Sequence, residues 1–199
     1  MNNIVSSKLF LVIIVYVCFL MTNVAIAEVR RDLKTLLHFI LDRYPDDHNN
    51  VYKIEFSSEV GSLAYSTSSS EFSVTDNNKI SIVKKCKIVI NPHVIHLYSI
   101  NAQAFLLAHE VAHCQLNHSQ KLITNYKNSW MQEYDADARA GHLLILSGYD
   151  PILGLKNLIP PTEIGSTSHP SKISRLASLN GIRRNYEIEN RHMQRLSSN

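Results

Sequence analysis

The chain carries little net charge, and its only notable apolar run lies near the start and is short. Its 199 residues include 20 Lys and Arg and 17 Asp and Glu, which gives a formal charge of +3 at pH 7. An excess this small gives no reason to expect nucleic acid as a partner. The apolar run at residues 9–21 has 13 residues, whereas a helix that spans a bilayer needs about 20. The small net charge therefore predicts no nucleic-acid partner, and the length of the run argues against a membrane-spanning helix.

The first 27 residues have the pattern of a secretory signal peptide. Lys8 is their only charged residue, the apolar run follows it, and Ala25-Ile26-Ala27 offers small residues at a cleavage site. We predict a signal peptide at residues 1–27 and a mature chain of residues 28–199 that is exported, either to the periplasm or as a secreted protein. If cleavage fails, the run stays as an anchor, and only then do we expect membrane association.

The mature chain is short of cysteine and has no evident repeats. Of three cysteines, Cys18 lies in the predicted signal peptide, which leaves Cys86 and Cys114. An even pair in an oxidising compartment favours a disulfide, although free cysteines also pack as small buried hydrophobes. Both states remain open at this point. The length of residues 28–199 suits one domain with a sizeable core.

The hydrophobic pattern predicts an α+β fold with a small β-sheet beside a helical core. Apolar residues recur at helical spacing in five segments: 28–44, 102–120, 129–147, 152–158 and 171–196. Strands are predicted at 51–56, 62–73, 79–83 and 86–90. The second of these is rich in Ser and Thr and also suits a flexible loop. The last helix is either continuous or interrupted at Gly181, and the sequence allows both.

One predicted helix carries the string His109-Glu110-Val111-Ala112-His113. Gly and Pro are absent from residues 102–120, so we expect a buried helix there. Residues four apart share one helix face, which directs both imidazoles to one point where they can bind a Zn²⁺ ion. Glu110 comes one position after the first histidine, where a general base can take a proton from a zinc-bound water.

A catalytic zinc site also needs a third protein ligand. One known pattern, with Gly three and His six positions after the second ligand, is absent because Leu116 and Ser119 occupy those places. His118 is off that spacing by one, and Cys114 is turned about 100° away on the helix. Glu133 is the better candidate, since it lies near the start of the next apolar helix.

Asp137 lies one turn beyond Glu133 on the same helix face. A carboxylate there can accept the free ring N–H of a zinc-binding histidine and so fix its orientation. The alternative is that both acids belong to a solvated helix face, because Asp135 and Arg139 are nearby.

These motifs resemble those of the HtpX-like and CAAX-prenyl-protease-like zinc peptidases, which are gluzincins. The features in common, in chain order, are H-E-x-x-H, His118-Ser119, Glu133-Tyr134-Asp135-Ala136-Asp137, Gly148-Tyr149-Asp150-Pro151, Ser168-His169-Pro170, Arg175 and Leu179. They cover about residues 85–180, and the earlier part of the chain matches less clearly. The resemblance implies a zincin-like metallopeptidase domain in which His109, His113 and Glu133 bind zinc. It also implies Glu110 as the base and Asp137 behind a ligand.

The activity that the resemblance implies is zinc-dependent hydrolysis of peptide bonds. Substrate binding through backbone pairing would give weak sequence preference, which suits exported or misfolded proteins as substrates. It places His169 and Arg175 near the cleft, where either is a candidate donor to the oxyanion. His169 could also be an ordinary loop histidine, or a latch that takes the open zinc position. Residues 87–90 are expected to pair with an extended substrate. The multiple membrane spans of integral members are lacking, so a prenylated protein in the bilayer is not expected as substrate.

Two other functions stay open. One is a binding or chaperone-like protein that keeps the metal for structure, but the presence of Glu110 argues against it because a structural site needs no base. The other is zinc-dependent hydrolysis of a non-peptide substrate, for which no motif names a small-molecule pocket.

Overall fold

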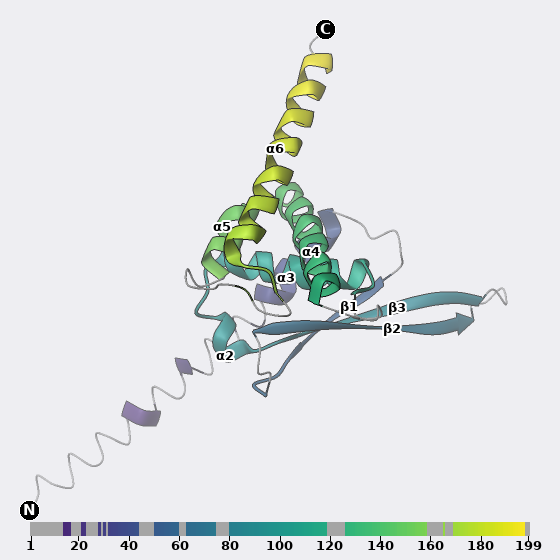
Figure 1. Ribbon diagram of the computed structural model, residues 1–199. Coiled ribbons are helices and arrows are strands. Elements are labelled where there is room, and N and C mark those ends of the chain that lie inside the picture. The colour runs from purple at the N-terminus through teal and green to yellow at the C-terminus, as the bar shows by residue number, and fades with distance from the viewer. Residues whose placement is uncertain are drawn as a thin grey trace, which may run out of the picture.

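A computed structural model describes residues 14–16, 21–22, 28, 30, 32–43, 50–59, 63–74, 80–118, 126–158, 165 and 169–197. The predicted signal peptide and the loop expected at 160–170 fall largely outside these residues. Figure 1 shows a small sheet, helices gathered over it, and a C-terminal helix that leads away from the body. This is the α+β architecture expected from the sequence.

Three strands form the sheet, β1 (Asn50–Phe56), β2 (Ala64–Val74) and β3 (Ile80–Ile90). Their order is β1-β3-β2, with β1 parallel and β2 antiparallel to β3. The short strands predicted at 79–83 and 86–90 are one strand, because Lys84 and Lys85 continue the ladders to both neighbours. The Ser- and Thr-rich segment is therefore a strand and not a loop.

The central position of β3 contradicts the expectation that residues 87–90 pair with substrate. Lys87 pairs with Lys53 of β1 on one side and with Thr67 of β2 on the other. Both edges of a central strand are occupied, so no further strand can add to it. The outer edges of this sheet belong to β1 and β2.

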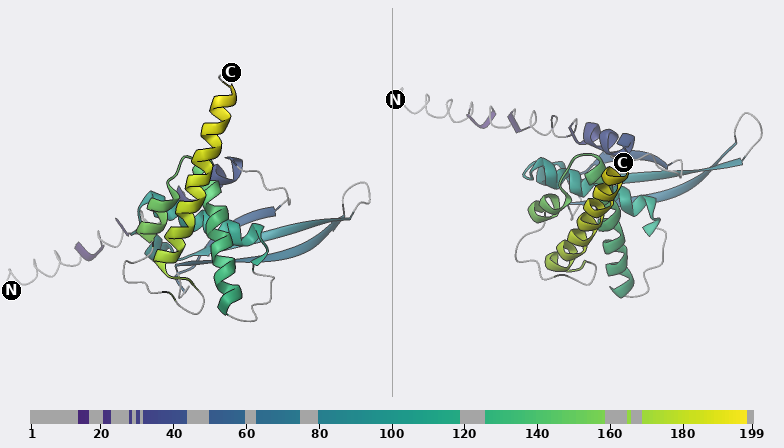
Figure 2. Two further views of the ribbon diagram at one scale, coloured as in Figure 1. Left: turned by 45° about the horizontal axis from the view of Figure 1, so that its top comes forward. Right: turned by 90° about the horizontal axis from the view of Figure 1, so that it is seen from above.

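The helices are α2 (Pro92–Ile95), α3 (Ile100–Gln115), α4 (Tyr126–Leu146), α5 (Pro151–Leu158) and α6 (Lys172–Ser197), and residues 32–43 are also helical. Figure 2 shows from two further directions that α3 to α6 lie over one face of the sheet, while the β2–β3 hairpin reaches past them. The α6 helix runs through Gly181 without a break. Within the part of the chain that the structure describes, no helix is both long and apolar enough to cross a bilayer.

Both ends of α3 have local causes. At its start, the Ser99 hydroxyl accepts a hydrogen bond from the Ala102 amide, which caps the helix. At its end, Asn117 has a φ of 60°, a left-handed conformation that turns the chain off the helix axis. The helix therefore stops at Gln115, five residues before the predicted end.

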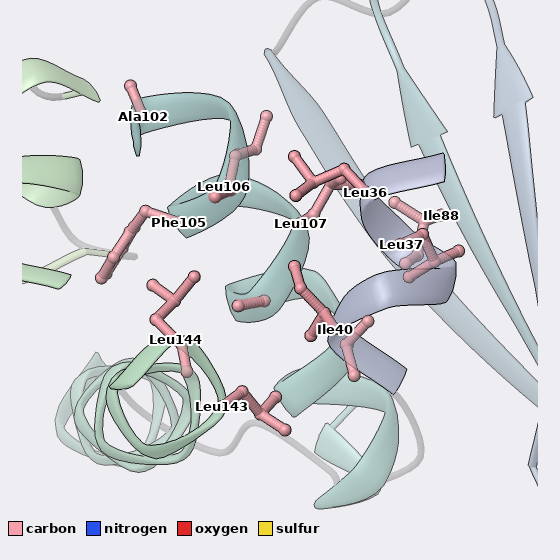
Figure 3. Packing of buried hydrophobic residues seen from close by; sticks show 14 of the residues in the cluster. Leu36, Leu37, Ile40, Ile88, Ala102, Phe105, Leu106, Leu107, Leu143 and Leu144 are labelled. Carbon is pink, nitrogen blue, oxygen red and sulfur yellow. The ribbon is translucent and has the colours of Figure 1, made fainter. Parts of the chain in front are cut away.

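The core surrounds α3, which packs against α4, α5 and the sheet. Figure 3 shows side chains from four elements meeting there: Leu36, Leu37 and Ile40 of residues 32–43, Ile88 of β3, Leu107 of α3, and Leu143 and Leu144 of α4. The helix predicted at 28–44 thus buries the leucines that its spacing placed on one face. As a result, α3 is held on several sides.

A disulfide between Cys86 and Cys114 joins β3 to the last turn of α3. The two Cα atoms are 5.9 Å apart, and both side chains are buried. Since Cys114 follows His113 directly, the bridge fastens this end of the helix to the sheet beside a candidate metal ligand.

Candidate metal centre

Two histidines of α3 meet on one face of the helix. Nε2 of His109 lies 3.0 Å from Nε2 of His113, and the ring centroids are 4.6 Å apart. Their separation of four residues places both rings over the same point. The His109 ring also stacks on Phe105, one turn earlier, and this packing limits its rotation.

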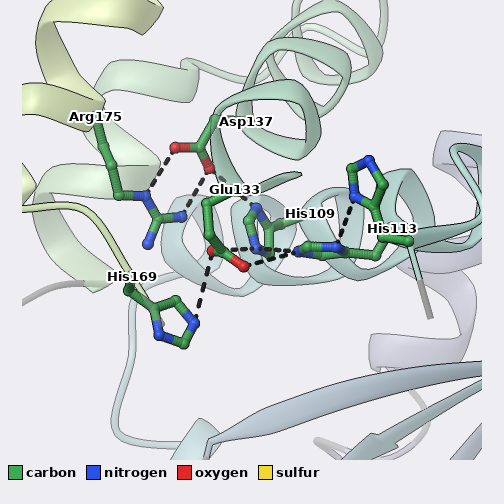
Figure 4. Close-up of polar contacts among 7 residues, drawn as sticks. His109, His113, Glu133, Asp137, His169 and Arg175 are labelled. Carbon is green, nitrogen blue, oxygen red and sulfur yellow. Dashed lines mark hydrogen bonds and ion pairs between the residues drawn. The ribbon is translucent and has the colours of Figure 1, made fainter. Parts of the chain in front are cut away.

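Glu133 of α4 brings a carboxylate to the same point. Its Oε2 lies 3.3 Å from Nε2 of His109, and its Oε1 lies 3.3 Å from Nε2 of His113. Figure 4 shows the carboxylate and the two rings converging between α3 and α4. The alternative of a solvated face is wrong, because Glu133 is only 7% exposed and Asp137 is fully buried.

The three side chains are arranged like the ligands of one metal ion. One donor atom from each lies within 4.8 Å of the others. Two imidazole nitrogens and a carboxylate oxygen suit Zn²⁺, and they suit other divalent first-row metals as well. Oε2 of Glu133 is buried, and its contacts with ring nitrogens of His109 and His169, at 3.3 and 3.6 Å, lack the geometry of good hydrogen bonds, so a bound cation would stabilise this oxygen. The residues therefore fit a single metal ion.

The electrostatics of the site favour positive charge at its centre. Burial would lower the pKa of His109, but Asp137 and Glu133 outweigh it and raise that pKa to about 10. Burial would raise the pKa of Glu133, yet its contacts with the two histidines hold it well below its usual value. The same two carboxylates that favour a proton on His109 would favour a metal cation, which binds the ring only in its deprotonated form.

Asp137 links His109 to the C-terminal helix. Its Oδ1 lies 3.0 Å from Nδ1 of His109, so the ring turns its other nitrogen toward Glu133. Nε and Nη2 of Arg175, in the first turn of α6, donate to the two Asp137 oxygens at 2.7 Å each. Burial alone would raise the pKa of Asp137, but Arg175 and His109 lower it. The carboxylate thus stays ionised behind His109.

The two tentative catalytic residues occupy different places. Arg175 is 5% exposed and directs two of its nitrogens at Asp137, which favours a positioning role over contact with an oxyanion. Nε2 of His169 lies 3.6 Å from Oε2 of Glu133, with the side chain about half exposed. Figure 4 shows Arg175 turned to Asp137 and His169 turned to Glu133. Of these two residues, His169 is the one that approaches a candidate metal ligand from the solvent side.

Glu110 lies on α3, and His118 lies just after its end. Glu110 directly follows His109 and is 7% exposed. His118 is buried, and its Nδ1 lies 2.9 Å from Nδ1 of His113. The spacing argument tests His118 only as a third metal ligand, so it does not predict that His118 contacts His113. The available signal is Asn117, a residue type that tolerates the left-handed turn needed to bring His118 back.

A family model described as Peptidase U49 matches residues 83–194. This region is more than half of the chain, and it contains α3, α4, α5 and every residue of the candidate metal centre. No curated protein and no solved structure matches the chain. The match confirms the expectation of a peptidase, while the narrower likeness to HtpX-like and CAAX-prenyl-protease-like enzymes stays a prediction. The chain belongs to the Peptidase U49 family.

Proposed function

We propose that this protein is a zinc-dependent endopeptidase of gluzincin type, with one Zn²⁺ ion held by His109, His113 and Glu133. The observation that carries the proposal is the convergence of three donor atoms within 4.8 Å, from two helices inside a peptidase family match. Two histidines spaced four residues apart and an acid from a second helix are the ligand types of catalytic zinc sites with one open position.

The roles of the other residues follow from their positions. A bound zinc ion supplies a Lewis acid that polarises the scissile carbonyl and acidifies water. Glu110 lies beside the first ligand on α3, so its carboxylate is the base that takes the proton from the attacking water and later passes it to the leaving amine. Asp137 keeps Nε2 of His109 directed to the centre, and Arg175 keeps Asp137 ionised.

The substrate class is a protein or peptide. Membership of a peptidase family supports this class over a small molecule. We propose exported or misfolded proteins as substrates, in keeping with the predicted signal peptide. The rival function, a binding protein with a structural metal, leaves Glu110 without a task at the centre.

The decisive experiment compares Glu110→Gln with the wild-type chain. Residues 28–199 are purified, bound zinc is measured by elemental analysis, and cleavage of casein is followed. We expect one zinc per chain in both proteins and a loss of at least 100-fold in cleavage by Glu110→Gln, since general base catalysis contributes about 10²–10⁴-fold. Glu189→Gln, on the exposed part of α6, is the control and should cleave normally. Full zinc occupancy without any cleavage that depends on Glu110 would favour the binding function.

We also propose that residues 1–27 are removed and that residues 28–199 act as a single exported domain, periplasmic or secreted. The pattern of one lysine, an apolar run and small residues supports this. Expression of the full chain in a bacterial host, followed by intact mass of the product, tests it. A mature N-terminus at Glu28 is expected, and a product that keeps residues 1–27 would contradict export by cleavage.

A further inference from the structure

Besides His169, another histidine that is not a candidate ligand, His118, lies against the candidate metal centre. His118 is 4% exposed, and its Nδ1 is 2.9 Å from Nδ1 of His113. The other nitrogen of His113, Nε2, is the one that lies near His109 and Glu133. His118 therefore contacts His113 on the side that is turned away from the candidate metal.

The contact restricts where His113 carries its proton. Two neutral imidazole nitrogens at hydrogen-bond distance share one proton, so one Nδ1 donates and the other accepts. A histidine that binds a metal through Nε2 has no proton on that nitrogen. Its Nδ1 then carries the proton and must donate it. In this arrangement the acceptor is Nδ1 of His118.

The backbone shows how His118 reaches this position. After α3 ends, the amides of Leu116 and Asn117 bond back to the carbonyls of Ala112 and Cys114 at 2.9 and 3.2 Å. The left-handed Asn117, with a φ of 60°, then reverses the chain. A continued helix would place a residue five positions on about 140° around the axis from His113. The turn at Asn117 instead brings His118 against the ring of His113.

We propose that His118 is a positioning residue of the metal centre, which holds His113 in the tautomer and orientation that present Nε2 to the ion. It does for His113 what Asp137 does for His109. This inference rests on the proposed metal site, and it assigns to His118 a share in metal affinity and no contact with substrate.

The test measures zinc affinity by competition with a chelator in three proteins: wild type, His118→Asn and His118→Phe. Asn places its side-chain oxygen about where His places Nδ1, so it can still accept from His113, whereas Phe fills the space without an acceptor. We expect His118→Phe to bind zinc about 10–100-fold more weakly, the usual effect of losing the partner of a ligand histidine. His118→Asn should stay within a few-fold of wild type.

Two controls separate positioning from general damage. The pair His142→Asn and His142→Phe, at an exposed histidine of α4, should leave zinc affinity unchanged. Thermal unfolding of the metal-free proteins should show His118→Asn and His118→Phe equally folded. In addition, ¹⁵N NMR of zinc-loaded wild type should show Nδ1 of His113 protonated.

The outcomes are distinguishable from failure of the proposed function. If wild type takes up no zinc, both proposals are overturned. If wild type binds zinc and His118→Phe binds it equally well, or His118→Asn is no better than His118→Phe, only the role of His118 is overturned. An unprotonated Nδ1 of His113 in the loaded protein would also overturn it.

Discussion

At the scale of single residues, the buried ion pair of Asp137 and Arg175 should be sensitive to substitution. Asp137 is fully buried, Arg175 is 5% exposed, and two hydrogen bonds of 2.7 Å join them. A buried charge that loses its partner is left with the full cost of desolvation. The pair also ends on Nδ1 of His109, so changes in it reach the metal centre.

Replacement of Asp137 by Asn should therefore affect both stability and metal binding. We expect the free energy of unfolding of the metal-free protein to fall by about 3–5 kcal/mol, because the buried guanidinium of Arg175 loses the charge of the Asp137 carboxylate. Zinc affinity should fall by about 10–100-fold. Urea unfolding and chelator competition measure the two effects. Asp135→Asn, at an exposed position of the same helix, is the control, and an equal effect there would contradict the prediction.

The second prediction at this scale concerns His169, whose Nε2 is 3.6 Å from Glu133 while half of the side chain is exposed. If the His169 imidazole acts as a latch by occupying the open coordination position of the metal, its removal frees that position for the reaction. We expect His169→Ala to raise the rate of casein cleavage, with His96→Ala, at an exposed histidine, unchanged. A lower rate would indicate a donor to the oxyanion, and an unchanged rate an ordinary loop histidine; either result rejects the latch.

At the scale of helices and strands, the site depends on how tightly α3 is held. The disulfide fastens its last turn to β3, and α5 approaches its first turns through Gly154. A Cβ atom on Gly154 would come within 2.7 Å of the Asn101 carbonyl oxygen and of Cβ of Phe105. Phe105 in turn stacks on His109, so this close approach helps to set the position of a candidate metal ligand.

Alanine substitutions at two helical glycines test this packing. Gly154→Ala should lower the free energy of unfolding by about 1–3 kcal/mol, because the added methyl group forces α5 away from α3. Gly181→Ala in α6 is the matched control, since within the described part of the chain no atom outside the adjoining helix backbone lies within 4 Å of its added methyl group. There we expect a gain of about 0.5–1 kcal/mol from helix propensity. Thermal unfolding of both variants measures the difference, and a stable Gly154→Ala would refute the close contact.

The elements also show what sequence alone can predict. Local periodicity places α3, α4 and the helix at 32–43, and the four-residue spacing of His109 and His113 follows from helix geometry. Pairing in the sheet is not local, and for this reason β3 is central where residues 87–90 were expected to be free. The partners of Arg175 and His118 depend on how α6 and the turn at Asn117 pack, and no spacing rule contains that information.

At the scale of the whole molecule, the candidate metal site joins segments that are distant in sequence. Its ligands come from α3 and α4, and their supports come from α6 and from the turn after α3. A ligand that binds only the folded state stabilises it in proportion to the logarithm of its concentration. Metal binding therefore acts on the fold as a unit and not only on the site.

Removal of metal should lower the stability of the whole domain. At free zinc 100 times the dissociation constant, we expect about 2.7 kcal/mol more stability than in the presence of a chelator. The midpoint of thermal unfolding, followed at increasing zinc concentration, measures it. His113→Ala should show a much smaller dependence on zinc. An equal rise in that variant would mean that zinc binds elsewhere.

The pairing of Asp137 with Arg175 has a consequence for the charge balance of the centre. The guanidinium compensates the carboxylate behind His109, so among the three candidate ligands only Glu133 would oppose the charge of a bound divalent ion. In the proposed site, these three ligands would leave one unit of positive charge on the ion. In the proposed reaction, that remaining charge would attract a carbonyl oxygen that gains negative charge during amide hydrolysis.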